Sequence, residues 1–312
     1  MKRNNAFLTA PLFASVLFLL LGLSDSLLKL VNEADIVFYA AILEMFVFVI
    51  PASFYLKIKE QNIFEYSKIR RVHFSDVPFI LSATGTFIFG SVIVSLLQIG
   101  IFGAQSSVQN AEILSANGFS AFLCFVLVPA FSEEFLFRSI LISDYAHYKG
   151  PVAVVISALL FSFMHFSFQN ILFYFFTGIL LGLITYVTDS AIPSFIIHTL
   201  YNSITLYFSS SLTSFFSGSS TSFILIFLVI VLFLFCLLST LTTMEEIYEK
   251  RSIMYENGLI EGKRRELFEN MSKAGLLEKK EKKKIFYAKE AFVSPTLFVA
   301  VVLFILITLN VI

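Results

Sequence analysis

The chain has 312 residues, of which 57% are hydrophobic and 14% are charged, and its formal net charge is zero. Its mean hydropathy of +0.85 lies far above that of soluble domains. This composition excludes an ordinary soluble protein and gives no reason to expect a nucleic-acid partner. The lipid bilayer is the expected surrounding of an integral membrane protein.

The first apolar stretch follows Lys2 and Arg3 and superficially resembles a signal peptide, but it lacks a convincing small-residue cleavage site. We therefore expect it to remain as the first helix. Cys124 and Cys236 each lie within an apolar run, where a cysteine acts as a small hydrophobic side chain. The sequence therefore predicts neither a disulfide framework nor a thiolate metal site.

Nine segments of the sequence approach the roughly 20 apolar residues that a helix needs to cross the hydrocarbon layer. In chain order, they are residues 6–26, 35–56, 78–102, 119–142, 151–168, 171–188, 192–208, 222–242 and 294–312. In lipid, every backbone amide must be satisfied within its own segment, and these runs are too long for barrel strands. The predicted fold class is all-α: a polytopic bundle of eight to nine transmembrane helices.

Basic residues occur in alternate connections between these segments. Lys and Arg follow the second span between residues 57 and 71, and twelve of the 22 lie between residues 244 and 293. The opposite connections, residues 103–118 and 209–221, contain none, and Lys29 is the single exception. Because cytoplasmic loops carry an excess of Lys and Arg, the N-terminus is predicted to be cytoplasmic.

The chain divides into five predicted parts. These are the first three helices at 1–118, a core of four helices at 119–208, an eighth helix at 209–243, a charged cytoplasmic helical segment at 244–293 and a last helix at 294–312. The charged segment ends in a lysine cluster. We expect a solvated linker, and binding of anionic lipids by the lysines is the alternative.

Three ionisable residues, Glu133, Glu134 and Arg138, lie inside the otherwise apolar fourth span. A charge at the centre of a bilayer costs about 2.5–3.5 kcal/mol, so such residues usually face the interior of a bundle and have a function there. Glu134 and Arg138 are four residues apart and can form an ion pair that holds the rotational setting of the helix. Glu133 lies about a hundred degrees round an α-helix from Glu134, so it is free to titrate.

Two histidines lie in neighbouring spans. His165 lies near the end of the fifth span. The seventh span contains His198 and Asn202, which are four residues apart and therefore lie on one face of a helix. A lone buried histidine is more often a satisfied core group than a catalyst. Because both intramembrane histidines lie in spans near the acidic helix, we expect a shared site.

These groups suit the hydrolysis of a peptide bond. Glu133 and His165 can hold a water molecule and remove its proton as it attacks a carbonyl carbon. His198 and Asn202 can donate hydrogen bonds to the oxyanion that develops. The sequence therefore predicts Glu133, His165, His198 and Asn202 as catalytic residues.

At these residues the sequence resembles the CPBP family, also called ABI, of CAAX proteases and bacteriocin-processing membrane proteins, which includes type II CAAX prenyl endopeptidases. Three motifs carry the resemblance: Glu133, Glu134 and Arg138 match EExxxR, Phe161 and His165 match FxxxH, and His198 and Asn202 match HxxxN. The resemblance covers about residues 119–208.

The resemblance implies an intramembrane endopeptidase with a cytoplasm-facing cavity. It implies that Glu133 and His165 activate water, that His198 and Asn202 stabilise the oxyanion, and that Phe161 supports the site. We expect a membrane-associated peptide or protein substrate, such as a lipidated CAAX-like protein or a bacteriocin precursor, and no cofactor. The expected location is the plasma membrane of a bacterium.

Three alternatives remain. Glu133, His165 and His198 could bind zinc as a His₂Glu set, although no HExxH helix is present. The protein could instead be a non-catalytic immunity or scaffold protein whose polar cluster holds helices together. A transporter is a weaker alternative, supported only by Asp25 and Glu44 in or near the first two spans.

Overall fold

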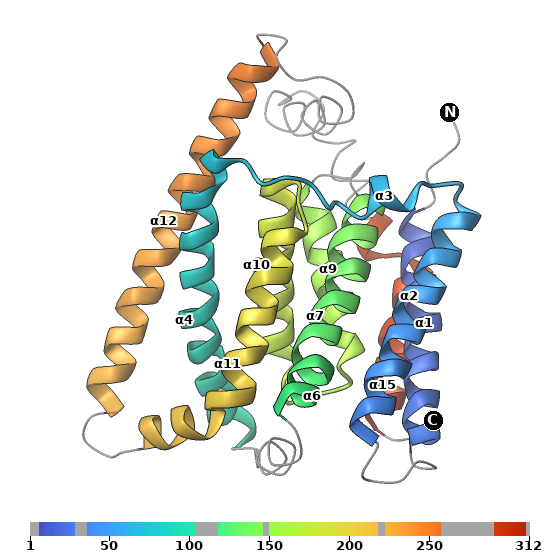
Figure 1. Ribbon diagram of the computed structural model, residues 1–312, viewed down its shortest axis with the longest axis horizontal. Helices are drawn as coiled ribbons and strands as arrows, with labels where there is room; N and C mark the ends of the chain where they lie inside the picture. The colour runs from blue at the N-terminus through green and yellow to red at the C-terminus, as the bar shows by residue number, and fades with distance from the viewer. Residues whose placement is uncertain are drawn as a thin grey trace.

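The computed structural model of the protein describes residues 6–28, 36–103, 118–145, 150–217, 222–256 and 290–309. In these ranges the regular secondary structure is helical, without a strand, and the long helices run side by side as a bundle (Figure 1). Seven of the described helices are long and apolar enough to cross a membrane. The predicted polytopic helical fold is confirmed.

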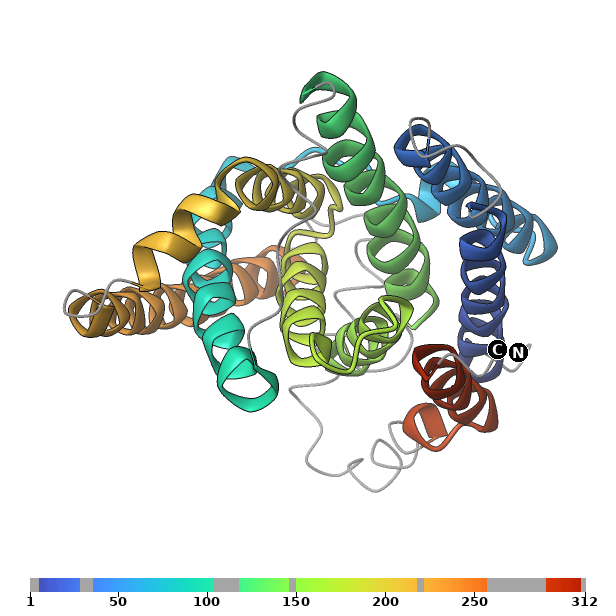
Figure 2. The same cartoon turned by 90° about the horizontal axis from the view of Figure 1, so that it is seen from below.

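One edge of the bundle contains both ends of the described chain. It is built from α1 (Ala6–Leu28), α2 (Ile36–Ile58) and α15 (Pro295–Thr308), as Figures 1 and 2 show. The hydroxyl of Ser294 donates a hydrogen bond of 2.5 Å to the carbonyl oxygen of Phe7, which ties the start of α15 to the start of α1. The rings of Phe13 and Tyr55 stack with centroids 4.3 Å apart and join α1 to α2.

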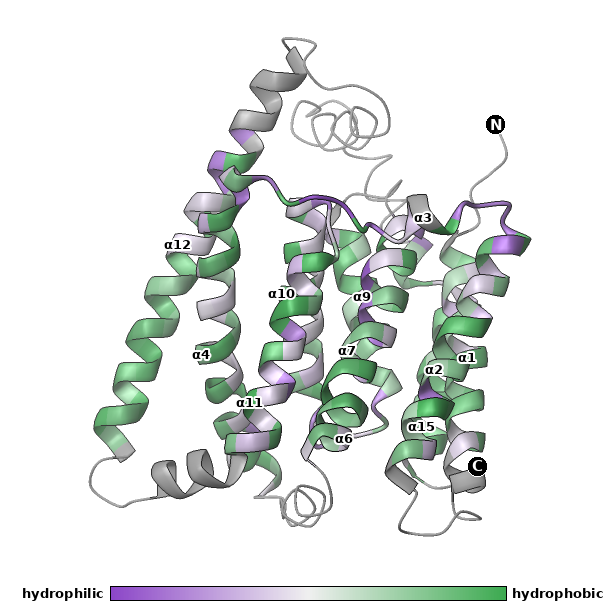
Figure 3. Cartoon of the chain, viewed as in Figure 1, coloured by the Kyte–Doolittle hydropathy of each residue, from purple (hydrophilic) through white to green (hydrophobic). Residues whose placement is uncertain are grey.

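The opposite edge pairs α4 (Val77–Phe102) with the long α12 (Ser222–Glu256). Two threonine hydroxyls, of Thr86 and Thr240, lie 2.9 Å apart between these helices. Hydrophobic residues cover most of the helix lengths, and hydrophilic residues gather near α3 (Ile63–Tyr66) and the start of α4 (Figure 3). An apolar exterior with polar residues toward one end is the pattern expected of a bundle in lipid.

The centre of the bundle begins with one helix that runs from Gly118 to Asp144. Its consecutive parts are α6 (Gly118–Phe122), the π-helical η2 (Leu123–Leu127), α7 (Val128–Glu133), the π-helical η3 (Glu134–Leu141) and α8 (Ile142–Asp144). π-helical turns are rare and frequently mark functional sites. The second of these wide stretches starts at Glu134, within the acidic motif.

Three further helices complete the centre: α9 (Gly150–Met164), α10 (Ile171–Thr188) and α11 (Ile192–Ser217). α9 and α10 pack closely against each other, and α11 contacts both α10 and the helix that contains the acidic motif. All candidate catalytic residues lie on, or one residue beyond, the helices of this central group.

Several predicted boundaries are wrong. The fifth helix ends at Met164 instead of 168, and Phe166 adopts a φ of 44°, a left-handed conformation that cannot continue the helix. Residues 209–217 were predicted to lie in the connection that follows the span 192–208, yet α11 includes them and reaches Ser217. An apolar run marks the part of a helix that lies in lipid, not the point where its hydrogen bonding stops.

The eighth helix also runs beyond its predicted end at 242, because α12 reaches Glu256. Part of the predicted charged segment, residues 244–256, is therefore helical. Residues 257–289 of that segment lie outside the described residues, and the division of the chain into five parts stays a prediction.

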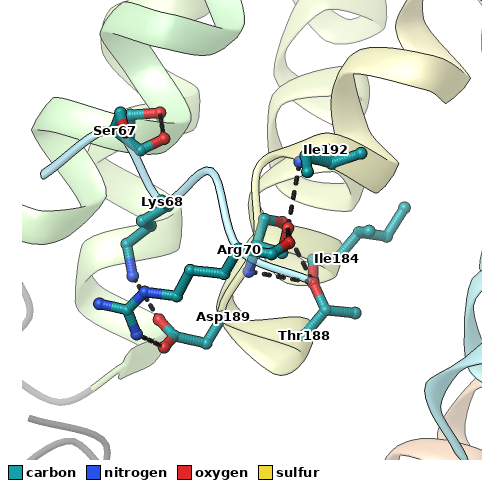
Figure 4. A network of polar contacts seen from close by, with 9 residues as sticks. Ser67, Lys68, Arg70, Ile184, Thr188, Asp189 and Ile192 are labelled. Carbon is teal, nitrogen blue, oxygen red and sulfur yellow. Dashed lines mark hydrogen bonds and ion pairs between the residues drawn. The ribbon is translucent and has the colours of Figure 1, made fainter. Parts of the chain in front are cut away.

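A short non-helical segment, residues 67–71, crosses the end of the bundle that carries α3, and we call it the strap (Figures 1 and 4). The Lys68 ammonium lies 2.8 Å from the Asp189 carboxylate, and Arg70 forms an ion pair with the same carboxylate. The Lys68 carbonyl oxygen accepts a hydrogen bond of 3.0 Å from the backbone N–H of Ala191. The strap is thus fixed to the turn between α10 and α11.

Candidate active site

The ion pair expected in the acidic helix is present and has a third member. The Arg138 Nε lies 3.2 Å from Glu134 Oε2, and both side chains are buried. The other carboxylate oxygen, Glu134 Oε1, lies 2.9 Å from Nδ1 of His198 on α11. Glu134 therefore joins two helices as well as neutralising Arg138.

Glu133 faces both histidines. Its Oε1 lies 3.9 Å from His165 Nε2, and its Oε2 lies 3.7 Å from His198 Nε2. These separations exceed those of a hydrogen bond, and among the described residues no side chain or backbone group hydrogen-bonds Glu133 Oε2. Glu133 therefore faces both imidazoles, while Arg138 forms its ion pair with Glu134.

His165 is oriented by its own helix. Its Nδ1 lies 2.8 Å from the carbonyl oxygen of Phe161, one turn earlier in α9. Because a carbonyl oxygen only accepts hydrogen bonds, Nδ1 must carry the hydrogen, and neutral His165 then presents the lone pair of Nε2 toward Glu133. The ring stacks on Tyr174 of α10, with centroids 3.6 Å apart and planes inclined by 19°, which restricts its rotation.

Phe161, the first residue of the FxxxH motif, lies between the ion pair and the two histidines. Its ring is 4.2 Å from the guanidinium carbon of Arg138, within the range of a cation–π contact. Ring centroids separate Phe161 from His165 by 4.8 Å and from His198 by 6.3 Å. A phenyl ring here holds the arginine on one side and packs against both imidazoles.

The four predicted catalytic residues line one cavity of about 340 Å³. Aromatic and small polar side chains complete its wall. They are Phe125, Phe161, Phe173, Tyr174, Thr177, Tyr201, Thr205 and Leu206. Glu133, His165, His198 and Asn202 are therefore brought together from three helices, and the size is that of a small-ligand pocket.

Three features of the site were not predicted from the sequence. The contact of Glu134 with His198 needs two helices to be docked, and Tyr174 is one of many aromatic residues with no motif around it. Glu44 of α2 was noted only as an acid within a span, and its carboxylate accepts a hydrogen bond of 2.8 Å from the hydroxyl of Ser132, the residue before Glu133. A lone acid in a span is the signal that could have linked α2 to the acidic helix.

The substitution Glu134→Gln should destabilise the protein, because it keeps the shape of the side chain but leaves Arg138 buried without a counter-charge. Breaking a buried ion pair by removing one partner costs about 3–5 kcal/mol. We expect a lower thermal unfolding midpoint of the protein in detergent and a lower yield. Glu133→Gln is the matched control, because Glu133 Oε2 has no hydrogen-bond partner among the described residues. Equal stability of the two variants would contradict this assignment.

Comparison with known proteins agrees with the geometry. Residues 115–204 match the family model described as type II CAAX prenyl endopeptidase Rce1-like, and this range contains all three motifs. No curated protein and no solved structure matches the chain significantly. The family implies protease activity of the CAAX type within the membrane. Residues 115–204 of this integral membrane protein are therefore similar to the Rce1-like family.

Proposed function

We propose that the protein is an endopeptidase that hydrolyses a peptide bond of a membrane-associated substrate with water activated by Glu133 and His165. The observation that carries this proposal is the position of Glu133, which faces two imidazoles at the wall of one cavity. A structural ion pair alone would need only Glu134 and Arg138. It would leave the approach of Glu133 to His165 and His198 unexplained.

In the proposed reaction, a water molecule lies between Glu133 and the lone pair of His165 Nε2. Glu133 accepts a proton from the water while the water oxygen forms a bond to the carbonyl carbon of the substrate. The electron pair of the carbonyl π bond moves to its oxygen. The tetrahedral intermediate then collapses: the C–N bond breaks, and the amine leaves with the proton that Glu133 had taken.

The developing oxyanion needs hydrogen-bond donors that are already in place. In the proposed mechanism these are the Nε2–H of His198 and the amide of Asn202, one helical turn apart on α11. The Nδ1 of His198 carries a hydrogen that it donates to the Glu134 carboxylate. With a second hydrogen on Nε2, the ring is an imidazolium in the proposed mechanism. The Glu134 carboxylate supplies its counter-charge.

The cavity wall favours an apolar substrate segment. Phe125, Phe173, Tyr174 and Tyr201 contribute aromatic surface around the catalytic groups. Aromatic rings bury large apolar areas, so side chains flanking the scissile bond would be held mainly by hydrophobic contact. CAAX-like proteins, with or without a lipid, and bacteriocin or other peptide precursors are the substrate classes that this surface fits.

Zinc bound by Glu133, His165 and His198 is the alternative way to activate water. Zinc binds carboxylate and imidazole at about 2.0–2.2 Å. Within the described residues, no group of three or more His, Cys, Asp or Glu side chains is arranged closely enough to hold a metal ion. The geometry fits the metal-free proposal better.

Metal analysis of the purified protein separates these alternatives. We expect less than one zinc per chain and no loss of peptidase activity after chelation. Stoichiometric zinc that is removed together with activity, and restored together with it, would contradict the metal-free mechanism.

Substitution of Glu133 by glutamine tests the proposed function. It keeps the side-chain shape and removes the base, so we expect normal protein abundance and the loss of specific cleavage products. The measurement is comparative peptidomics of cells that express the unchanged chain or the Glu133→Gln variant. The control, Glu246→Gln, removes an exposed carboxylate on α12 and should leave the products unchanged. If Glu133→Gln leaves every product in place, the protein is a scaffold rather than a protease.

A further inference from the structure

α10 contributes two polar side chains to the wall of the cavity, those of Tyr174 and Thr177. The two residues are three positions apart and therefore lie on the same face of the helix. The Tyr174 ring stacks on His165, which places this face of α10 against the catalytic groups. Thr177 belongs to none of the three motifs, yet it lies on the face of α10 that meets them.

The rotation of α10 is fixed at the level of Thr177. The next residue, Gly178, faces α9 so closely that an added Cβ atom would lie 2.8 Å from the Cα atom of Ala158. Only a glycine allows the two helix backbones to approach in this way. α10 also contacts α4 and α11 and lies near the middle of the bundle (Figure 2). The packing of α10 therefore holds Thr177 at the cavity wall.

The hydroxyl of Thr177 has no hydrogen-bond partner among the described residues, although its oxygen is buried and the residue is only 3% exposed. A threonine hydroxyl in a helix can donate a hydrogen bond to the carbonyl oxygen four residues earlier. Six threonines of the described helices make this bond: Thr84, Thr86, Thr188, Thr240, Thr243 and Thr308. The described residues thus leave the Thr177 hydroxyl unused.

A buried hydroxyl without a partner costs free energy, so such a group in a folded protein calls for an explanation. Thr199 of α11 has a similar hydroxyl, but Thr199 does not line the cavity. A helical threonine has two favourable χ1 rotamers, so its hydroxyl and methyl groups can exchange places while the helix stays fixed. The Thr177 hydroxyl can therefore meet a molecule in the cavity without any movement of α10.

A peptide segment in this cavity brings backbone N–H and C=O groups that need hydrogen-bond partners, because the bilayer supplies none. The side chains of Phe125, Phe161, Phe173 and Leu206 in the cavity wall offer no hydrogen bond. A hydroxyl group can donate to a C=O group or accept from an N–H group. The Thr177 hydroxyl therefore suits an amide of the peptide backbone.

We propose that Thr177 is a substrate-binding residue whose hydroxyl forms a hydrogen bond with a backbone amide of the peptide segment in the cavity. The motif residues reach the cavity from the central helix, α9 and α11, and Thr177 adds a contact from α10. The inference rests on the proposed function in one respect, which is that the cavity holds a peptide.

Three substitutions in the full chain, purified in detergent, test this proposal. Thr177→Val replaces the hydroxyl by a methyl group, and Thr177→Ser keeps the hydroxyl. Thr185→Val is the matched control, because Thr185 is also buried on α10 but its hydroxyl lies 2.7 Å from the hydroxyl of Ser194. The probe is an N-acetylated, C-amidated dipeptide of leucine, which carries backbone amides and no charge.

Without the dipeptide, Thr177→Val should unfold at the same temperature as the unchanged chain, because the lost hydroxyl had no partner. Thr185→Val should unfold at a lower temperature, because the Ser194 hydroxyl loses its partner. The rise of the unfolding midpoint with dipeptide concentration then measures binding. We expect Thr177→Val to weaken binding about tenfold, as the loss of one hydrogen bond implies. Thr177→Ser and Thr185→Val should bind as the unchanged chain does.

Three results would overturn the proposal. The first is equal affinity of Thr177→Val and the unchanged chain for the dipeptide. The second is a dipeptide that does not bind the unchanged chain, because the cavity would then not hold a peptide. The third is an unfolding midpoint of Thr177→Val as low as that of Thr185→Val, because the Thr177 hydroxyl would then serve the fold.

Comparative peptidomics separates this inference from the proposed function. If Glu133→Gln leaves every product in place, the peptidase fails, and the dipeptide titration still decides whether Thr177 binds a peptide. If products vanish in Glu133→Gln while Thr177→Val binds the dipeptide normally, the peptidase stands and the role of Thr177 is refuted.

Discussion

Charged side chains within a bilayer must be neutralised by one another, and this constraint organises the centre of the protein. The Glu134 carboxylate contacts two partners: one oxygen lies 3.2 Å from Arg138 Nε, and the other lies 2.9 Å from His198 Nδ1. The contact fixes both the rotation of the acidic helix and the position of α11 beside it. Arg138 forms its ion pair with Glu134, and Glu133, the residue before it in the chain, faces the two imidazoles and the cavity. A buried ion pair of this kind need not add stability, but it selects one arrangement of helices over others.

The parts around this centre serve different purposes. Phe161 packs against Arg138 and both imidazoles, and its carbonyl oxygen fixes the hydrogen of His165 on Nδ1. The strap holds the turn at Asp189, after which α11 starts, so His198 is positioned from the N-terminal end of α11 as well.

Much of this architecture could be predicted from the sequence, because lipid imposes simple rules. Long apolar runs gave the helices, and the cost of buried charge singled out Glu133, Glu134 and Arg138. The end of α9 could not be predicted, because the left-handed conformation of Phe166 leaves no compositional signal. The same holds for the contact between Glu134 and His198 and the stacking of Tyr174, which depend on how docked helices meet. Spacing within one helix can be read from a sequence, but distances between helices cannot.

The central claim is that Glu133 activates water rather than attacking the substrate itself. A single turnover in ¹⁸O-labelled water, with enzyme in excess over a peptide identified as substrate, tests this claim most directly. The account predicts that the new carboxyl terminus carries one ¹⁸O atom from the first turnover, because the attacking oxygen comes from solvent. A first-turnover product without ¹⁸O would show that a carboxylate oxygen of the enzyme had attacked the carbonyl carbon, and would contradict the account.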